Sequence, residues 1–437
     1  MIEPHAVRYK SAVPSSPAPA TPHTKAPLSI TSEIQVDLQR LAHNIAVVRR
    51  LIGRHVELCC VIKADAYGLG AARIARWMDH LPVDLLAVYT LDQAEQLCRA
   101  NIGKPVLVLM PIHEAPRSGP VYRGIVSGKM HCVVHDLAHL NHLIQLADGF
   151  GCRLPVHVEV DTGMSRGGAN RAEAREILER IASTRAVELR GFFTHYSSAE
   201  SDERATDEQL AAFTALVNEL GPLIPETCRL HAAGTHAVLR DPRHHLDMVR
   251  IGLAWTGYGH EALRDEIHLA GGEDLKPIIT WTSRLVHTKW IETGTTVGYG
   301  RTWRAKRRTR VGLVPVGYAD GYPVALSNKA VVRVQTSAGW QSAPVIGRVS
   351  MDQLTIDLTD VAPVDVAVGA VVELIGDDAS SGNHLATLSR LANVQPYMLL
   401  CGLSSRIARV YRNQVLPQPQ VEAPVQPAQS ARPAAGA

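Results

Sequence analysis

Residues 38–62 read LQRLAHNIAVVRRLIGRHVELCCVI, an amphipathic stretch followed by a short apolar run. Apolar side chains recur at helical spacing in the first half, which predicts a helix with one buried face. The residues of that face are Leu38, Leu41, Ile45 and Val48. LCCVI at residues 58–62 is typical of a strand that is buried on both sides. Together the two segments predict one helix–strand unit.

Further apolar runs follow along the chain, and helical patterns separate most of them. The runs are LLAVY (85–89), VLVLM (106–110), HCVV (131–134), VHVEV (156–160), LRGFF (189–193), CRL (228–230) and MVRIG (248–252). One of the intervening helices begins at Thr90, with Gln93 three residues later in a capping-box arrangement. Eight strands that alternate with helices over about 240 residues predict a TIM-type (β/α)8 barrel rather than an open doubly wound sheet.

The pattern changes after residue 274, where strand-like segments alternate with turn sequences such as DGYP and SAGW. These segments are IITWTSRLVHTKWI (278–291), VGLVPVGYA (311–319), AVVRVQTS (330–337), APVIGRVS (343–350), QLTIDL (353–358) and AVVELIG (370–376). One helix is predicted at residues 384–393. We therefore expect an α/β chain with a barrel at 33–273 and an all-β domain at 274–412. Residues 1–32 and 413–437 are rich in Pro and Ala, and we expect both to be disordered.

Composition excludes several classes of protein. The net charge of +3 is small for a dedicated nucleic-acid binder. No run of 18 or more apolar residues exists, which excludes a membrane-spanning helix. The N-terminus lacks the apolar core of a signal peptide, so we expect a cytoplasmic protein. The seven cysteines are never spaced as C-x-x-C, which disfavours a disulfide framework or a zinc knuckle.

Reactive side chains follow the predicted barrel strands at their carboxyl ends, where such barrels place their active sites. The residues concerned are Lys63, Arg166, His195, Thr235, Arg250, Gly252 and Leu253. Gly234 and Thr235 form a turn that opens a helix, which offers backbone N–H groups and a hydroxyl to an anion. A lysine on one side of the barrel mouth and a phosphate cradle on the other predict a pyridoxal phosphate site.

The stretch VIKADAYGLG (61–70) resembles the cofactor-lysine signature of the alanine racemases, which are pyridoxal phosphate enzymes built from a barrel and a β domain. The further matching stretches are DTGMSRGG (161–168), THY (194–196), VRIGL (249–253), VGYG (297–300), VGYADGY (316–322) and GRVSMDQ (347–353). The resemblance covers residues 33–412. It implies an isomerase that interconverts L- and D-alanine and supplies D-amino acids for the cell wall.

The resemblance also implies roles for individual residues. Lys63 binds pyridoxal 5'-phosphate covalently and acts as one catalytic base, and Tyr299 from a partner subunit acts as the other. The cofactor is further held by Tyr67, His195, Thr235, Arg250, Gly252 and Leu253. The substrate is bound by Arg166 and Met351, while Tyr318 and Asp352 support the site from behind. The protein is then a homodimer with shared active sites.

Two positions depart from the family pattern. Glu159 stands where the racemases usually have a lysine, often carbamylated. Strand alternation in VHVEVD points Glu159 into the barrel, where its carboxylate is expected to hold Arg166. Ser405 stands where we expect a tyrosine that narrows the substrate pocket. The missing ring predicts a wider range of substrates, such as serine, lysine and arginine.

Other interpretations remain open at this point. A non-catalytic pyridoxal phosphate-binding protein resembles the region around Lys63 but consists of the barrel alone. A barrel-type amino-acid decarboxylase would need a glycine-rich phosphate segment and a cysteine-centred motif, which the sequence lacks. The basic run RTWRAKRRTR (301–310) suggests nucleic-acid or membrane binding, but a solvated loop is the expected interpretation.

Overall fold

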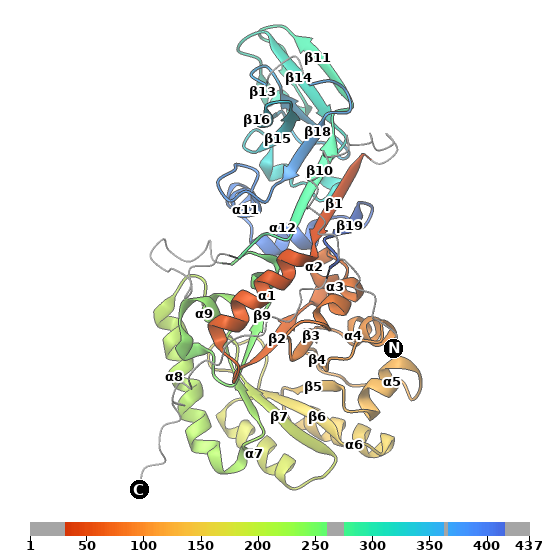
Figure 1. The fold of residues 1–437 in the computed structure, drawn as a ribbon. Coiled ribbons are helices and arrows are strands. Elements are labelled where there is room, and N and C mark those ends of the chain that lie inside the picture. Colours follow the sequence, from red (N-terminus) through yellow and green to blue (C-terminus); the bar gives the residue numbers. More distant parts are fainter. Residues whose placement is uncertain (1–30, 260–274, 362–365, 416–437) are drawn as a thin grey trace, which may run out of the picture.

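The computed structural model describes residues 31–259, 275–361 and 366–415. The predicted disorder of residues 1–32 and 413–437 concerns segments that lie almost entirely outside these ranges. Two domains lie end to end, with the barrel below and the sheet-rich domain above (Figure 1). All eight barrel strands lie between residues 57 and 251, and the part of the chain from residue 275 onward builds most of the sheet-rich domain.

The barrel has eight parallel strands in the order β8-β7-β6-β5-β4-β3-β2-β9, which makes it nearly closed. Its strands are β2 (Glu57–Val61), β3 (Leu85–Val88), β4 (Val106–Val108), β5 (Met130–Val134), β6 (Leu154–Glu159), β7 (Val187–Phe193), β8 (Arg229–His231) and β9 (Met248–Ile251). Every predicted barrel strand is present, and the predicted (β/α)8 architecture is confirmed. Backbone hydrogen bonds between β8 and the start of β9, such as Asp247 N–H to the Leu230 carbonyl at 3.0 Å, join the two ends of the barrel.

Helices and short helical turns lie around the barrel and at its mouth (Figure 1). They are α1 (Leu38–Ile52), α2 (Lys63–Gly68), α3 (Ala71–Met78), α4 (Leu91–Arg99), α5 (Gly119–Val126), α6 (Leu137–Phe150), α7 (Arg171–Ala182), α8 (Glu203–Leu220), α9 (Thr235–Arg240) and α10 (Leu253–Thr256). The predicted apolar face of α1 is fully buried. The Thr90 hydroxyl accepts the Gln93 N–H, as the capping box predicts, but the Gln93 side chain accepts from the Tyr89 N–H instead of from Thr90.

The interior of the barrel is lined by alternate residues of each strand. A small apolar cluster fills part of it, made of Cys59, Leu85, Ala87, Leu107, Val133, Phe193 and Met248. On β6, His157 faces this interior, whereas Val156 and Val158 belong to the larger core under the helices. The prediction that the valines of β6 face outward and Glu159 faces inward is therefore confirmed.

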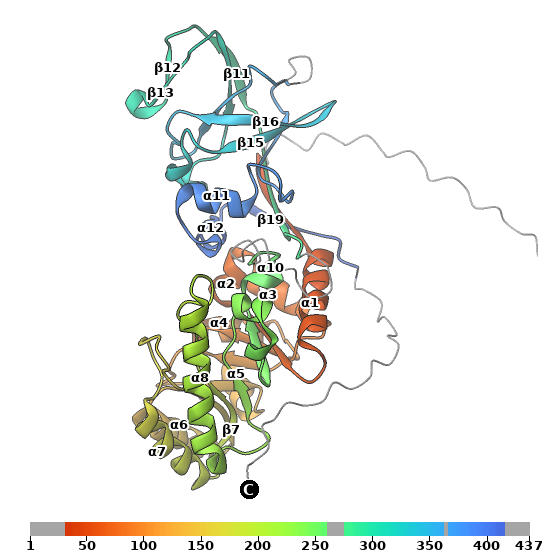
Figure 2. The ribbon, with the colours of Figure 1, turned by 90° about the vertical axis from the view of Figure 1, so that its left-hand side faces the viewer.

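The second domain is built on a nine-stranded sheet in the order β11-β14-β17-β16-β15-β18-β10-β1-β19. Its strands are β1 (Ser32–Asp37), β10 (Ile279–Arg284), β11 (His287–Ile291), β14 (Thr309–Val314), β15 (Val331–Thr336), β16 (Gly339–Ile346), β17 (Leu354–Asp357), β18 (Val371–Ile375) and β19 (Ala408–Arg412). A two-stranded ribbon, β12 (Thr296–Val297) and β13 (Trp303–Arg304), lies at its far end (Figure 2).

The predicted start of the barrel at residue 33 differs from what the structure shows. β1 was predicted to belong to the barrel, but it pairs antiparallel with β10 and parallel with β19, so it is part of the second domain. Ile34 and Val36 alternate with polar residues and are fully buried against that sheet. The second domain is also not all-β, because it contains α12 (Pro396–Gly402) in addition to α11 (Leu385–Ala392), which was the one helix predicted there.

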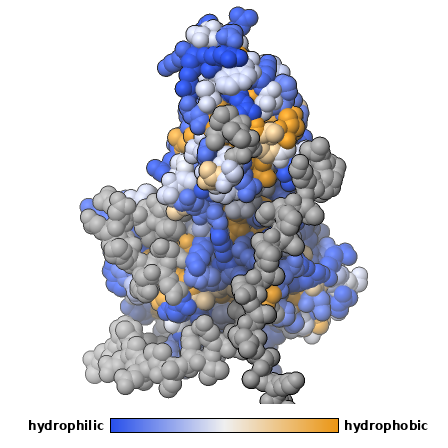
Figure 3. Space-filling view, turned by 45° about the horizontal axis from the view of Figure 1, so that its top comes forward, coloured by the Kyte–Doolittle hydropathy of each residue, from blue (hydrophilic) through white to orange (hydrophobic). Residues whose placement is uncertain are grey.

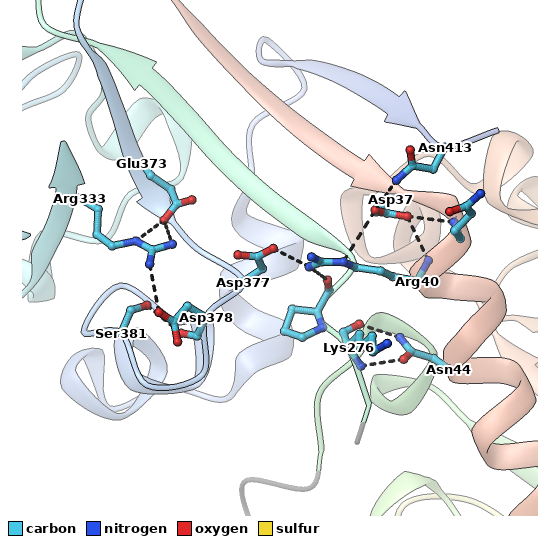
Figure 4. Close-up of polar contacts among 12 residues, drawn as sticks. Asp37, Arg40, Asn44, Lys276, Arg333, Glu373, Asp377, Asp378, Ser381 and Asn413 are labelled. Carbon is cyan, nitrogen blue, oxygen red and sulfur yellow. Dashed lines mark hydrogen bonds and ion pairs between the residues drawn. The ribbon is translucent and has the colours of Figure 1, made fainter. Parts of the chain in front are cut away.

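Polar contacts fix the junction between the two domains (Figure 4). Arg40 of α1 pairs with Asp377 of the second domain at 2.6 Å and donates to the Pro277 carbonyl at 3.0 Å. The Asn44 side chain bonds both backbone groups of Lys276, at 2.8 and 2.9 Å. These contacts hold α1 against the segment that links the domains, so the barrel mouth keeps one orientation relative to the sheet.

The basic run at 301–310 lies at the far end of the second domain, where Figure 3 shows a largely hydrophilic surface. Most of its cations are exposed, as predicted for a solvated segment. Arg307 pairs with Asp360, and Arg308 pairs with Glu292 at 3.5 Å, so part of the charge is compensated locally. Within the described ranges, no helix has the length and apolar character needed to cross a membrane.

Candidate active site

Lys63 begins an unusual turn directly after β2. The four residues that follow it, Ala64 to Tyr67, have φ angles of 53° to 56° and form a left-handed helical turn. Such a turn costs roughly 1–2 kcal/mol per residue for L-amino acids, so other contacts must hold it. The Asp65 carboxylate accepts the Ala71 N–H at 2.7 Å, and the Asp65 carbonyl accepts the Gly70 N–H at 2.9 Å. The turn places Lys63 and Tyr67 together at the barrel mouth.

The environment of Lys63 favours its neutral amine. Burial lowers the pKa of Lys63, and the nearby positive charge of Arg166 lowers it further. A neutral amine is the form that reacts with a carbonyl group and accepts a proton. The structure therefore gives Lys63 the electrostatic environment that a cofactor-binding lysine needs.

Three hydroxyl groups meet around Gly252, just after β9. The Thr235 hydroxyl accepts the backbone N–H of Gly252 at 3.1 Å and that of Ala254 at 3.2 Å. A Cβ atom at Gly252 would lie 2.4 Å from the Tyr67 hydroxyl and 2.7 Å from that of Tyr397, so only glycine fits. Burial raises the pKa of Tyr397 to about 12 and that of Tyr67 well above its usual value, so both hydroxyls stay protonated as donors. Hydroxyls at a helix N-terminus suit a phosphate group.

Tyr397 is a site residue that sequence reasoning missed. It comes from α12, and its ring centroid lies 4.9 Å from that of Tyr67, which stacks in turn on Trp255 at 5.6 Å. Ser405, where a pocket tyrosine was expected, is instead exposed in the turn between α12 and β19. Tyr397 lies beside Tyr67 and Gly252, so it belongs to the hydroxyl cluster, and the wider substrate range expected from Ser405 stays a prediction. The Pro396–Tyr397 pair after a turn was the signal for this helix, since proline favours the first helical position.

Arg250 is buried and held on several sides. Its guanidinium lies 3.0 Å from His195 Nδ1 and 2.6 Å from His231 Nδ1, and it donates to the carbonyls of Thr194 (2.8 Å) and Ala232 (3.0 Å). The expected contact between His195 and Arg250 is present. The second histidine, His231, was not predicted, although it directly follows the strand-like CRL segment. An arginine fixed in this way presents its charge at a single position.

The contact with His231 continues as a chain of buried histidines. His231 Nε2 lies 3.1 Å from His157 Nδ1, and His157 Nε2 lies 3.0 Å from His131 Nδ1. Because the guanidinium can only donate, His231 Nδ1 accepts, and each following histidine then donates from Nε2 to the next Nδ1. Burial lowers the pKa of His131 to about 4 and those of His157 and His231 well below their usual value. The three rings are therefore neutral, with defined tautomers.

Arg166 lies in the loop between β6 and α7, which also carries Asp161. The Asp161 carboxylate accepts the backbone N–H groups of Gly163, Met164 and Ser165 at 2.9 to 3.0 Å, which shapes the loop. The predicted ion pair between Glu159 and Arg166 is wrong. Glu159 Oε2 instead lies 3.3 Å from Nδ1 of His135, which directly follows the neighbouring strand β5. Arg166 is exposed, and within the described ranges it has no ion-pair partner.

The remaining predicted residues lie on the second domain, and none of them has a contact with Lys63 among the described residues. Tyr299 lies between β12 and β13 at the far end of that domain, whereas α2 lies at the barrel end (Figure 2). Tyr299 is 72% exposed and Met351 is 54% exposed. Asp352 pairs with Arg406 at 2.7 Å, and the Tyr318 N–H donates to the Ser350 carbonyl at 3.0 Å. Within one chain, the structure does not bring these residues together with Lys63.

Comparisons with known proteins assign this site to a family. A family model described as the N-terminal domain of alanine racemase matches residues 36–260, and one described as its C-terminal domain matches residues 278–411. The chain belongs to the alanine racemase family. Racemases are isomerases, so the protein is an enzyme of that class. The resemblance inferred from the sequence is confirmed.

Individual alanine racemases agree with this assignment over most of the chain. That of Treponema pallidum is 34% identical over 389 residues, which cover 86% of this chain and 98% of that protein. The solved structure of the biosynthetic alanine racemase from Pseudomonas aeruginosa matches with a TM-score of 0.76 and 29% identity, covering 88% of this chain and all of that one. The alanine racemase from Bartonella henselae, solved with covalently bound pyridoxal phosphate, shares the fold at a TM-score of 0.73 and 23% identity, covering 87% of this chain and 99% of that one.

Proposed function

We propose that the protein is a pyridoxal phosphate-dependent alanine racemase in which Lys63 binds the cofactor covalently. One observation carries the proposal: Lys63, the hydroxyls around Gly252 and the guanidinium of Arg250 lie at the same end of one barrel. The Bartonella henselae relative supports the choice of cofactor. When bound, the cofactor withdraws electrons from the amino acid joined to it and so acidifies the Cα hydrogen.

The residues present fit this cofactor. The hydroxyls of Tyr67, Thr235 and Tyr397 would bind its phosphate, together with backbone N–H groups of the helix that begins at Thr235. Arg250 would bind the pyridine end. An arginine keeps its proton at any working pH, so it would disfavour protonation of the pyridine nitrogen. Arg250 thereby limits electron withdrawal and suppresses side reactions such as transamination.

The chain's own residues move the proton at Cα. Racemisation removes a proton from one face of Cα and returns one to the other face, so two groups must flank the substrate. Lys63 serves one face through its amine, and we assign the other face to the phenolic oxygen of Tyr299. Since Tyr299 is exposed on the far end of the second domain, it reaches Lys63 only in another copy of the chain. The proposed enzyme is therefore a homodimer in which Tyr299, Met351 and Asp352 of each copy complete the other copy's site.

We propose alanine as the main substrate, with Arg166 as the group that binds its carboxylate. Arg166 is exposed and without an ion-pair partner among the described residues, so its guanidinium is free to bind a carboxylate through two parallel hydrogen bonds. A wider range that includes serine, lysine and arginine remains the expectation from Ser405, because Tyr397 packs against Tyr67 and is not shown to replace the ring missing at position 405. The D-alanine produced is a cell-wall building block.

The test is a panel of L-alanine, L-serine, L-lysine and L-arginine, assayed for the D-enantiomer by chiral chromatography. We expect L-alanine to be converted and the other three to turn over within roughly 100-fold of it, because a missing group in a pocket is worth only about 1–3 kcal/mol in discrimination. Release of carbon dioxide without D-product would indicate a decarboxylase instead. Bound cofactor with no turnover of any amino acid would indicate a binding protein, an alternative that the match to the C-terminal domain at 278–411 disfavours.

A further inference from the structure

We propose that Arg409 of the second domain is a positioning residue, which fixes the turn that carries Lys63 and Tyr67 at the barrel mouth. The inference rests on the proposed function, in which that turn binds the cofactor. Arg409 lies on β19, which runs from the sheet towards α2 and α3 (Figure 1). Its guanidinium donates to backbone carbonyls, so it acts through the segments that it holds.

Two backbone carbonyls at the end of the lysine turn accept hydrogen bonds from β19. Arg409 Nε donates to the Gly68 carbonyl at 2.9 Å, and the Tyr411 hydroxyl donates to the Leu69 carbonyl at 2.8 Å. The four residues before Gly68 all have left-handed φ angles, a conformation that is costly for L-amino acids. The strained turn is therefore braced by two side chains that lie 341 and 342 residues later in the chain.

The same guanidinium also holds the segment that follows α12. Arg409 Nη2 donates to the Leu403 carbonyl at 2.8 Å, and Nη1 donates to the Ile407 carbonyl at 2.7 Å. Nη1 also donates to the carbonyl of Ser404. The N–H groups of an arginine form a rigid planar fork, so acceptors bound to one guanidinium keep fixed positions relative to one another. A single cation thus joins the lysine turn to the end of α12.

The two segments that Arg409 joins both carry hydroxyls of the proposed phosphate site. They come very close at Gly68, where a Cβ atom would lie 3.0 Å from a backbone carbonyl of α12. Across this contact, the ring centroids of Tyr67 and Tyr397 lie 4.9 Å apart. A turn released from β19 would shift Lys63 and Tyr67 together. Arg409 therefore fixes both the amine that binds the cofactor and part of the site for its phosphate.

The central experiment compares the variants Arg409→Gln and Arg409→Lys with the wild-type enzyme. Arg409→Gln removes the charged donor, so we expect the dissociation constant for pyridoxal phosphate to rise by roughly 10- to 150-fold, the range of one charge-assisted hydrogen bond. At saturating cofactor kcat should also fall, while KM for L-alanine changes little, because Arg166 lies in a different loop. Arg409→Lys keeps the charge but not the fork, and should recover part of the lost affinity.

A deuterium isotope effect separates positioning from a purely structural role. A displaced Lys63 takes the Cα proton more slowly, whereas Tyr299 acts on the opposite face and comes from a different domain. With alanine deuterated at Cα, the isotope effect in Arg409→Gln should therefore rise more for one enantiomer than for the other. A variant that is merely less stable would keep the wild-type isotope effects.

The same strand supplies a matched control and a milder variant. Arg412 pairs with Glu33 at 3.6 Å, and Arg412→Gln should leave cofactor affinity and kcat unchanged. Tyr411→Phe keeps its ring but loses the hydrogen bond to Leu69, so the dissociation constant for the cofactor should rise by roughly 2- to 10-fold. Thermal unfolding should show that each variant is folded.

Wild-type cofactor affinity and kcat in a folded Arg409→Gln would overturn the proposal, and so would an equal loss in Arg412→Gln. If Arg409→Gln does not fold, unchanged affinity and kcat in both Arg409→Lys and Tyr411→Phe would overturn it instead. A wild-type chain that binds no pyridoxal phosphate would overturn the proposed function itself.

Discussion

Nη1 of Arg250 lies 2.6 Å from Nδ1 of His231, a short contact inside the barrel. His231 is in turn the first of three neutral histidines that run across the interior, followed by His157 and His131. A buried arginine is expensive to bring out of water, and fixed acceptors on several sides offset that cost. The histidine chain therefore fixes the position of the Arg250 charge, at the place where the pyridine end of the cofactor would bind.

Replacing His231 should disturb the reaction through Arg250. His231→Asn moves the acceptor away from the guanidinium, and losing one charge-assisted hydrogen bond costs about 1.5–3 kcal/mol. We expect kcat/KM to fall by roughly 10- to 150-fold. A loosely held Arg250 should also allow more transamination, measured as pyruvate released per turnover. Normal kinetics together with normal pyruvate release would show that the other hydrogen-bond partners of Arg250 are enough to hold its guanidinium in place.

Replacing Lys63 should abolish both cofactor attachment and catalysis. Lys63→Ala removes the covalent link and the base on one face of Cα together, so we expect a loss of activity of several orders of magnitude. After borohydride reduction, mass spectrometry should find the cofactor on wild-type chains and not on the variant. Racemisation by Lys63→Ala at a wild-type rate would refute the assignment of this lysine.

Tyr299→Phe should keep the cofactor bound and stop racemisation, because only one face of Cα retains its base. In deuterium oxide the variant should still exchange the Cα hydrogen of one alanine enantiomer through Lys63. Heterodimers of Lys63→Ala with Tyr299→Phe contain one intact site if sites are shared between subunits, and they should regain activity. Confirmed heterodimers without any activity would contradict the shared site.

Tyr397→Phe should weaken cofactor binding while keeping the ring that packs against Tyr67. The lost hydroxyl is one of three that meet at Gly252, so we expect roughly a 10-fold rise in the dissociation constant for pyridoxal phosphate, from about 1–1.5 kcal/mol. Tyr397→Ala removes the ring as well and should weaken cofactor binding further. Ser405→Tyr should leave cofactor binding unchanged and shift the substrate preference towards alanine. An unchanged substrate ranking in Ser405→Tyr would contradict the expectation for that position.

The buried histidines should make the barrel sensitive to acid. The pKa of His131 falls from its ordinary 6.5 to about 4 because of burial, so the unfolded chain binds a proton at a higher pH than the folded one. The contribution of His131 to the free energy of unfolding is complete above pH 6.5. It is lost as the pH falls towards 4, which lowers the free energy of unfolding by about 3 kcal/mol. His131→Asn should flatten the decline in the urea midpoint between about pH 7 and pH 4. An equally steep decline in this variant would assign the sensitivity to other groups.

The sequence by itself determined the barrel, its eight strands and the residues at their ends. The physical reason is local: strand and helix periodicities differ, and carboxyl ends of parallel strands meet at one mouth. Lys63 directly follows an apolar run, Thr235 opens the helix after another and Arg250 lies within a third, so their position in the chain fixed their position in the fold. The inward orientation of Glu159 followed from strand alternation in the same way.

Only the tertiary structure decided the contacts between segments that are distant in sequence. β1 pairs with strands about 250 and 375 residues later, as in Glu33 opposite Thr282 and Ala408, and no local pattern specifies a partner at that distance. Tyr397 reaches Gly252 because α12 packs on α2. Glu159 pairs with His135 rather than Arg166 because the barrel sets two neighbouring strand ends side by side. Periodicity determines which face a side chain occupies, whereas its partner depends on which elements pack together.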